Sequence, residues 1–265
     1  MAGIYVNDKG TWKLPKSVWV KSGTWRVCKN VYINNRGYWQ ELIKTIDITS
    51  SKSNFNLWEY VGSPTEPISL IVNIASGIEI FSNDTSGNRT PALTVGNFPT
   101  NSTVIVNNNG YISGGGGFGG VGGIGPSGSA SNGTNGGDGI VKGSSNNFDI
   151  TITNTGTIAG GGGGGSAGSA VYYEGPPNPQ TGVRPRYWVS GGNGGQGAGI
   201  TGFSRTQGGN GQNVSNGVSG GNGGSLGEDG LPTPTGNGSS FGAGGKAIGS
   251  DIEVAVSGTI IGAVG

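Results

Sequence analysis

The tract GGGGFGGVGGIGPSG at Gly114–Gly128 decides the fold of this chain, because its residues repeat with a period of three. The large residues Phe118, Val121 and Ile124 stand three apart, and GGNGGQGAG at 191–199 repeats Gly-Gly-X in the same way. A period of three fits neither an α-helix nor a β-strand, but it fits the extended left-handed helix with three residues per turn. The glycine tracts are therefore expected to form extended threefold rods.

Rods of this kind need neighbours. A single rod makes no internal hydrogen bonds, and glycine loses much backbone entropy when it is ordered. Because glycine has no Cβ, several rods can lie close enough to bond N–H to C=O between them. The sequence predicts a polyglycine-II sandwich, a stack of glycine rods with the other residues projecting as loops. A disordered linker is the alternative, since the 265 residues include 60 glycines and 12 prolines. The tryptophans and strand-like segments argue against disorder.

Composition excludes several classes of function. The formal net charge is +1 and charged residues make up 11% of the chain, so no surface for nucleic acid is expected. Histidine is absent and the acidic residues are scattered, so we expect no enzyme, no metal site and no cofactor. The single cysteine, Cys28, excludes an internal disulfide. No apolar run is long enough for membrane insertion, and the first residues lack the pattern of a secretory signal.

Residues 4–42 contain three related units: IYVNDKGTWKLPK, SVWVKSGTWRVCK and NVYINNRGYWQEL. Each unit has an alternating strand, a polar turn with glycine and a second strand with tryptophan, which is typical of a β-hairpin. The hairpins should form a β-meander with Trp12, Trp19, Trp25 and Trp39 on one face. These tryptophans either form the core of a small module or dock onto a partner. The units are similar to the Gly-Thr-Trp-Lys repeats of phage tail proteins.

The rest of the chain is also mainly β, with little or no helix. The run ISLIVNI at 68–74 and shorter strand candidates predict a β-sandwich-like domain at 44–113. A second repeat, at 103–117, 149–163 and 251–265, aligns without gaps and should brace the glycine rods. The expected units are thus an attachment module at 1–43, the β-rich domain at 44–113, and a glycine-rich unit at 114–265 that a C-terminal strand closes.

The inserts between the glycine tracts contain the candidate binding residues. The longest insert, at 169–190, combines Tyr, Trp and Arg, which are enriched at interface hot spots, with prolines that stiffen a loop. Alternatively, these aromatic residues cap the end of the rods without meeting a ligand. The residues expected to bind a receptor are Tyr172, Tyr173, Arg184, Arg186, Tyr187, Trp188, Phe203, Arg205 and Leu231.

The layout of the chain resembles the glycine-rich adhesins at the tip of the long tail fibres of T-even-like phages. The resemblance covers about 103–265 and rests on YISGGGGFGG, TIAGGGGGGS and the GGNGG tracts at 191–195 and 220–224. It implies a polyglycine-II sandwich whose end loops bind outer-membrane proteins of the host. It also implies an amino-terminal part that clasps the trimeric end of a tail fibre, with Trp12, Trp19, Trp25 and Trp39 as the docking candidates.

The hypothesis that follows is a non-enzymatic virion adhesin, assembled in the host cytoplasm and carried at a tail-fibre tip. Its receptor would be a bacterial outer-membrane protein or a surface glycan. One alternative is a purely structural glycine-rich spacer or virion protein, for which exchanging the loops would not change host range. An ice-binding protein ranks below both, because the third positions of the tracts are not uniformly small.

Overall fold

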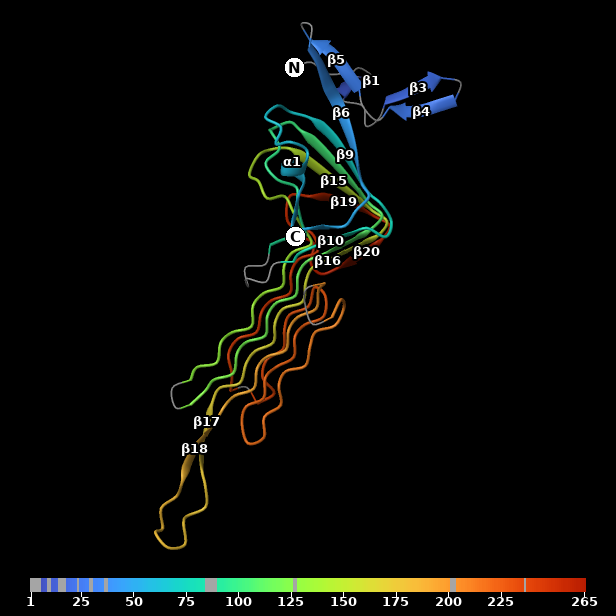
Figure 1. Cartoon of the computed structure of the whole chain (residues 1–265). Helices are drawn as coiled ribbons and strands as arrows, with labels where there is room; N and C mark the ends of the chain where they lie inside the picture. The colour runs from blue at the N-terminus through green and yellow to red at the C-terminus, as the bar shows by residue number, and fades with distance from the viewer. Residues whose placement is uncertain are drawn as a thin grey trace.

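The fold is almost entirely β, as the sequence predicts. The computed structural model describes residues 6–8, 11–13, 18–22, 24–28, 31–35, 38–83, 90–125, 128–200, 204–235 and 237–265, with side chains from Ile43 onward except that of Val256. Within these segments the only helix is α1 (Leu57–Tyr60), and the Asn56 side chain caps it by accepting from the Glu59 N–H. Figure 1 shows a stack of strands from which a long bundle of extended segments projects.

The tryptophan units form antiparallel hairpins, but not a meander. The pairs are β1 (Val6–Asp8) with β2 (Thr11–Lys13), β3 (Val18–Ser22) with β4 (Thr24–Cys28), and β5 (Val31–Asn35) with β6 (Tyr38–Ile48). Among the described strands, the first two hairpins are separate two-stranded sheets, whereas the third joins a larger sheet. The third hairpin joins the larger sheet because the second half of β6, from Ile43 to Ile48, pairs in parallel with β9 (Ser69–Ile74).

A three-sided stack of parallel strands forms the body of the molecule, and we call it the solenoid. Its first side is a six-stranded sheet in the order β19-β15-β12-β9-β6-β5, in which every pair except β5–β6 is parallel. The strands that follow β9 in this sheet are β12 (Thr103–Asn108), β15 (Asp149–Asn154) and β19 (Glu253–Val256). Each parallel strand comes from a new turn of the chain around the stack.

The other two sides of the solenoid are narrower parallel sheets. The second side contains β7 (Lys52–Ser53), β10 (Glu79–Phe81), β13 (Tyr111–Ser113), β16 (Thr157–Ala159) and β20 (Thr259–Ile261). The third side contains β8 (Phe55–Asn56), β11 (Leu93–Thr94) and β14 (Ile140–Val141). Isolated bridges from Ile140 to Ile248 and from Ile248 to Val264 continue the third side.

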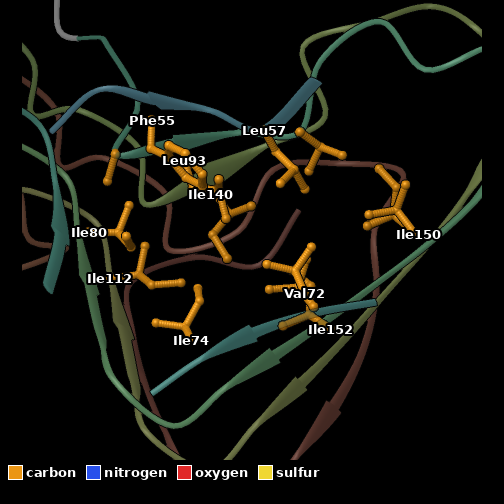
Figure 2. Close-up of a cluster of buried hydrophobic side chains, with 14 of the residues drawn as sticks. Phe55, Leu57, Val72, Ile74, Ile80, Leu93, Ile112, Ile140, Ile150 and Ile152 are labelled. Carbon is orange, nitrogen blue, oxygen red and sulfur yellow. The ribbon is translucent and has the colours of Figure 1, made fainter. Parts of the chain in front are cut away.

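The hydrophobic core fills the space between the three sides (Figure 2). Alternate residues of β9 and β12 are buried, which is the period-two pattern of a sheet with one face on a core. Ile74 and Ile152 from the first side, Ile112 from the second and Ile140 from the third are all fully buried. Stacked Ile, Leu and Val side chains therefore hold successive turns together, at roughly 1.5–3 kcal/mol for each fully buried side chain.

The solenoid replaces the sandwich expected for residues 44–113. The repeats at 103–117 and 149–163 do stack in the register that their alignment predicts, with Thr103 opposite Asp149. However, they supply the core of the solenoid instead of bracing the glycine rods, because like residues in successive turns pack on one another when the strands pair in parallel. Strands from both sides of residue 113 share the same sheets, and β19 and β20 lie at the sheet edges.

The glycine tracts form the projecting bundle, which we call the glycine array. Its segments are 114–124, 128–139, 160–170, 190–199, 208–213, 218–225, 228–233 and 239–247. The segment 160–168 is completely buried among the others. In chain order, the backbone acceptors for the N–H groups of residues 161–166 are Gly137, Ala198, Glu228, Thr134, Gly195 and Leu231. Every third N–H therefore returns to the same neighbouring segment.

Side chains at the surface of the array accept the hydrogen bonds that backbone carbonyls cannot. Asn132, Asn135 and Asp138 stand three residues apart, and their Oδ1 atoms accept from the N–H groups of residues 240, 243 and 246 at 3.0, 2.9 and 2.7 Å. In the same way the Asn193 side chain accepts from the Gly122 N–H at 2.8 Å. The recurrence of Asn and Asp at third positions thus has a structural cause, the satisfaction of outward backbone donors.

The array has a near end beside the solenoid and a far end (Figure 1). Arg205 lies at the near end, where it contacts residues of β10 and β13. Gly168 bridges Gly238 toward the far end, and the chain beyond residue 170 leaves the array there. Loops that follow one another in the sequence therefore project from opposite ends.

Candidate functional site

A hairpin projects from the far end of the array, formed by β17 (Val171–Glu174) and β18 (Arg186–Val189) (Figure 1). It extends segments 160–170 and 190–199 beyond the packed glycines. Among the described residues, the glycine segments do not pair with its two strands, which instead pair with each other as an antiparallel ladder and carry large side chains. Its large aromatic residues are 39–48% exposed: Tyr172, Tyr173, Tyr187 and Trp188.

The tip of the hairpin is held by its own backbone. The Gly175 N–H donates to the Pro185 carbonyl, and the Asn178 N–H donates to the Val183 carbonyl, both at 2.9 Å. The Asn178 Oδ1 accepts from the N–H groups of Gln180 and Thr181, and its carbonyl accepts from Gly182, whose φ is +67°. A closed turn of this kind, rich in proline, loses little further entropy on binding.

One face of the hairpin consists of Tyr172, Glu174, Arg186 and Trp188, because these residues alternate with the others and are paired across the strands. The Tyr172 hydroxyl donates to Glu174 at 2.8 Å, and the Arg186 Nε lies 3.5 Å from the same carboxylate. Partial desolvation raises the pKa of Tyr172, and the hydrogen bond with Glu174 raises it further. The Tyr172 and Trp188 rings are tilted, with centroids 5.4 Å apart.

The opposite face consists of Val171, Tyr173, Tyr187 and Val189. The Tyr173 and Tyr187 rings are stacked, with centroids 6.2 Å apart and planes 21° apart. Neither hydroxyl has a hydrogen-bond partner among the described residues. A Cβ built on Gly217 would lie 3.0 Å from Val189 Cγ1 and 2.9 Å from Val214 Cγ1, so this face meets the neighbouring loop at its base.

The structure thus brings together five of the residues predicted to bind a receptor: Tyr172, Tyr173, Arg186, Tyr187 and Trp188. Arg184 lies in the exposed tip of the same hairpin. Phe203 lies outside the described residues.

Two other predicted residues lie away from the hairpin. Arg205 forms an ion pair with Glu79 and lies over the Tyr111 ring at 5.7 Å, at the near end of the array. The hydrogen bond with Glu79 raises the pKa of Arg205 above its ordinary value. Leu231 is 51% exposed on the side of the array, where it lines a shallow groove of about 290 Å³ with Gln207, Asn222, Glu228 and Asp229.

The candidate docking tryptophans lie on the amino-terminal hairpins, and only their backbone positions are described. Trp12 pairs with Asn7, Trp19 with Val27, Trp25 with Lys21, and Trp39 with Asn34. They therefore occupy strand positions, as the hairpin pattern predicts.

Sequence reasoning missed some contributors to the hairpin. Val183 is 65% exposed at the tip, and Asn178 organises the turn. The Asn-Pro-Gln-Thr-Gly run is a turn signal that could have identified Asn178. The contact between Val189 and the loop at 214–217 has no local signal, because it joins residues from different connections.

The described part of the chain offers no metal site formed by three or more His, Cys, Asp or Glu side chains. None of its helices has the length and apolar character needed to cross a membrane.

Comparisons with known proteins identify a matching family and a solved structure with a similar fold. A family model described as phage tail fibre adhesin Gp38 matches residues 43–265. The gp37–gp38 adhesin tip complex of the bacteriophage S16 long tail fibre, a solved structure, includes a similar fold with a TM-score of 0.53 and 22% identity, and the match covers 85% of this chain and 83% of that one. No curated protein matches the sequence significantly.

Proposed function

Because this chain belongs to the Gp38 family of phage tail fibre adhesins, we propose that its β17–β18 hairpin is the surface that binds a receptor on the bacterial cell. The chain is a receptor-binding adhesin of the virion tail fibre. Of the loops of this adhesin, the hairpin is the one that we assign to the contact with the receptor. Binding by this surface requires no catalytic step.

The observation that carries this assignment is the exposure of four large aromatic side chains on an isolated projection, 39–48% each. Aromatic and arginine side chains supply most of the binding energy at typical interfaces, and an ordered tip lowers the entropy lost on contact. The far end of the array is also the end that is remote from the solenoid (Figure 1). The hairpin is therefore placed where a cell surface could reach it first.

The frame that holds the hairpin is assigned here as a polyglycine-II sandwich. In support, the N–H groups of residues 161–166 turn to a different neighbouring segment at each step and repeat after three. A helix with three residues per turn produces this rotation, and a β-strand would alternate between two directions. A packed lattice of such rods would hold the hairpin at a fixed height and direction.

The opposite part of the molecule is assigned to attachment. The matched solved structure is a complex of gp37 with gp38, and by analogy a tail-fibre protein would hold the amino-terminal module at 1–43. The tryptophans Trp12, Trp19, Trp25 and Trp39 are the docking candidates. Replacing Trp25 and Trp39 with Ala should reduce recovery of the adhesin on purified fibres while leaving binding of the free protein to cells intact.

Deleting the hairpin tests the receptor assignment. The labelled full chain and a variant with residues 171–189 replaced by Gly-Gly would be titrated onto a panel of Gram-negative strains. We expect the deletion to abolish binding to every strain that the full chain binds. The double variant Tyr173→Ala/Tyr187→Ala should lose affinity roughly 100-fold, because two exposed aromatic side chains of the hairpin are truncated.

The matched control is Phe241→Ala, which removes another exposed aromatic ring, 42% exposed, from the array. It should bind like the unaltered chain. If the deletion variant folds, by circular dichroism, and still binds cells as well as the full chain, the hairpin is not the receptor contact.

A further inference from the structure

We infer that one face of the hairpin, formed by Val171, Tyr173, Tyr187 and Val189, contacts the receptor, and that its ligand is an acidic loop of a bacterial outer-surface protein. This inference rests on the proposed function and makes it more specific, because it distinguishes the two faces of the same hairpin. We call this surface the Tyr173–Tyr187 face and the opposite one the Tyr172–Trp188 face.

Three polar side chains of the Tyr172–Trp188 face, those of Tyr172, Glu174 and Arg186, are already paired with one another. Glu174 accepts a hydrogen bond from the Tyr172 hydroxyl at 2.8 Å and pairs with Arg186 at 3.5 Å. The Arg186 guanidinium also lies 5.9 Å from the centroid of the Tyr172 ring. A ligand that used these groups would first have to displace their partners, so the net gain from contact would be small. This face is suited to stiffening the hairpin.

The Tyr173–Tyr187 face has polar groups that are free to bind. Both rings are about half exposed, at 47% and 48%, and neither hydroxyl is bonded within the described chain. Their stacking, with planes 21° apart, fixes the two rings side by side. Two phenols held in this way can donate to acceptors on a ligand while the rings bury apolar area.

This face also continues onto a second loop. The proximity of Val189 to Gly217 and Val214 extends the apolar surface from the hairpin to the neighbouring turn. Val183, 65% exposed, adds an aliphatic group at the tip. Aliphatic surface gains most from apolar side chains, which a protein loop offers and the hydroxyl-covered surface of a glycan offers less.

The charges of the hairpin indicate the charge of the ligand. Arg186 is compensated by Glu174, whereas Arg184 has no ion pair within the described residues and is exposed. One uncompensated positive charge and two phenol donors favour carboxylates and backbone carbonyls as partners. An acidic protein loop supplies both, together with apolar side chains.

Paired conservative variants test which face makes the contact. The experiment uses the full chain and a strain on which the 171–189 deletion abolishes binding. Tyr173→Phe/Tyr187→Phe removes the free hydroxyls and should weaken binding about tenfold, since two hydrogen bonds to the ligand are lost. The control Tyr172→Phe/Trp188→Phe alters the opposite face and should stay within about twofold. Arg184→Gln should weaken binding at low salt and reduce its dependence on salt.

The class of ligand is tested on treated cells. Proteinase treatment of the cells should remove binding, and periodate treatment, which oxidises sugars, should not. Binding that survives proteinase and is lost after periodate would overturn the protein assignment in favour of a glycan.

The face assignment fails if the control pair weakens binding more than the tyrosine pair does, or if both pairs are neutral. In either case the proposed function stands, because the deletion still abolishes binding. If the deletion itself leaves binding intact on every strain, the proposed function fails instead.

Discussion

Individual glycines in the array differ in how strictly they are required. A Cβ on Gly194 would lie 2.1 Å from the Gly165 carbonyl oxygen, and a Cβ on Gly164 would lie 1.8 Å from the Phe118 carbonyl oxygen. These neighbours are backbone atoms that cannot rotate away. The segment 160–168 is buried on all sides, which explains why its sequence, GGGGGGSAG, has no large residue at any third position. Segments at the surface instead have a larger residue wherever a side chain can point outward.

Substitution of one packed glycine tests this requirement. Gly194→Ala should lower the free energy of unfolding by at least about 3 kcal/mol, because the added methyl group forces two hydrogen-bonded segments apart. Gly249→Ala is the matched control, since a Cβ there would meet its nearest atom at 3.4 Å, an ordinary contact. Chemical denaturation followed by circular dichroism measures both. Equal stability of the two variants would mean that the segment around Gly194 is not packed as described.

Tyr111 supplies a second test at the scale of one residue. Its hydroxyl oxygen is buried without a hydrogen-bond partner in the described chain, and desolvation raises the pKa of its phenol above the ordinary value of 10.0. A raised pKa favours the protonated phenol in the folded state. The folded state therefore keeps its full stability with respect to this ionisation below pH 10. That contribution to stability is lost as the pH rises from 10 through the pKa of Tyr111 in the folded state.

Tyr111→Phe should thus raise the free energy of unfolding by about 1 kcal/mol at neutral pH, because a buried unsatisfied hydroxyl is removed. It should also reduce the loss of stability above pH 10. Denaturant titrations at pH 7 and at several values above 10 measure both effects. At pH 7, Tyr60→Phe on an exposed ring is the control and should leave the free energy of unfolding unchanged, and a destabilised Tyr111→Phe would show that the hydroxyl is satisfied in solution.

At the scale of elements, polar ladders fix the register of the solenoid. Asn108 and Asn154 are buried in successive turns, and the Asn108 Nδ2 donates to the Asn154 Oδ1 at 2.7 Å. The Asn108 Oδ1 also accepts from the Gly110 N–H at 3.1 Å, which shapes the turn into β13. A slip of one residue would separate Asn108 from Asn154 and also expose the core face of the shifted strand.

Asn108→Ala should therefore lower the free energy of unfolding by about 2–3 kcal/mol, since it leaves the Gly110 N–H and the side-chain Oδ1 of Asn154 buried and unpaired. The control is Asn107→Ala on the same strand. Its side chain donates to Asn73 on the outer surface at 2.9 Å, and its loss should cost less than about 1 kcal/mol. Thermal or denaturant unfolding distinguishes the two. An equal cost for both would contradict a special role for the buried ladder.

The sequence predicts some elements well and others poorly, for physical reasons. Alternation predicts the strands β12, β15 and β19 and their mutual register, because the three copies align without gaps. The earlier turns of the solenoid have a different number of residues between their strands, so the sequence does not show that they are equivalent to the three aligned repeats. The third side has strands of two residues, such as Leu93–Thr94, which leave no periodic pattern at all. Parallel pairing therefore replaced the expected sandwich without a local signal.

At the scale of the whole molecule, the direction in which each glycine segment runs decides at which end of the array the next loop lies. The sequence does not show whether a glycine segment runs toward or away from the solenoid. The sequence therefore does not separate Arg205 from Tyr187 and Trp188, although Arg205 lies at the near end and is paired with Glu79. The candidate residues of the 169–190 insert lie together because its two halves pair as antiparallel strands.

The same geometry suggests how the parts work as one body. The Arg205–Glu79 pair and the packing of Tyr111 and Ile261 against Ala159, Ala198 and Leu226 join the array to the solenoid. A mechanical load on the hairpin would then pass to the fibre through backbone hydrogen bonds and a packed core. Apart from the hairpin and its neighbouring loop, the molecule should remain exposed to solvent when it is bound to a cell.

Hydroxyl-radical footprinting of the full chain on vesicles from the outer membrane of a bound strain measures this distribution directly. We expect oxidation of Tyr173 and Tyr187 to fall on binding, while Tyr60 on the solenoid and Phe241 on the array react as they do in the free protein. Protection of Tyr60 or Phe241 with the hairpin tyrosines unchanged would show that the cell is bound by a different surface, and would contradict the assignment of the hairpin as the receptor contact.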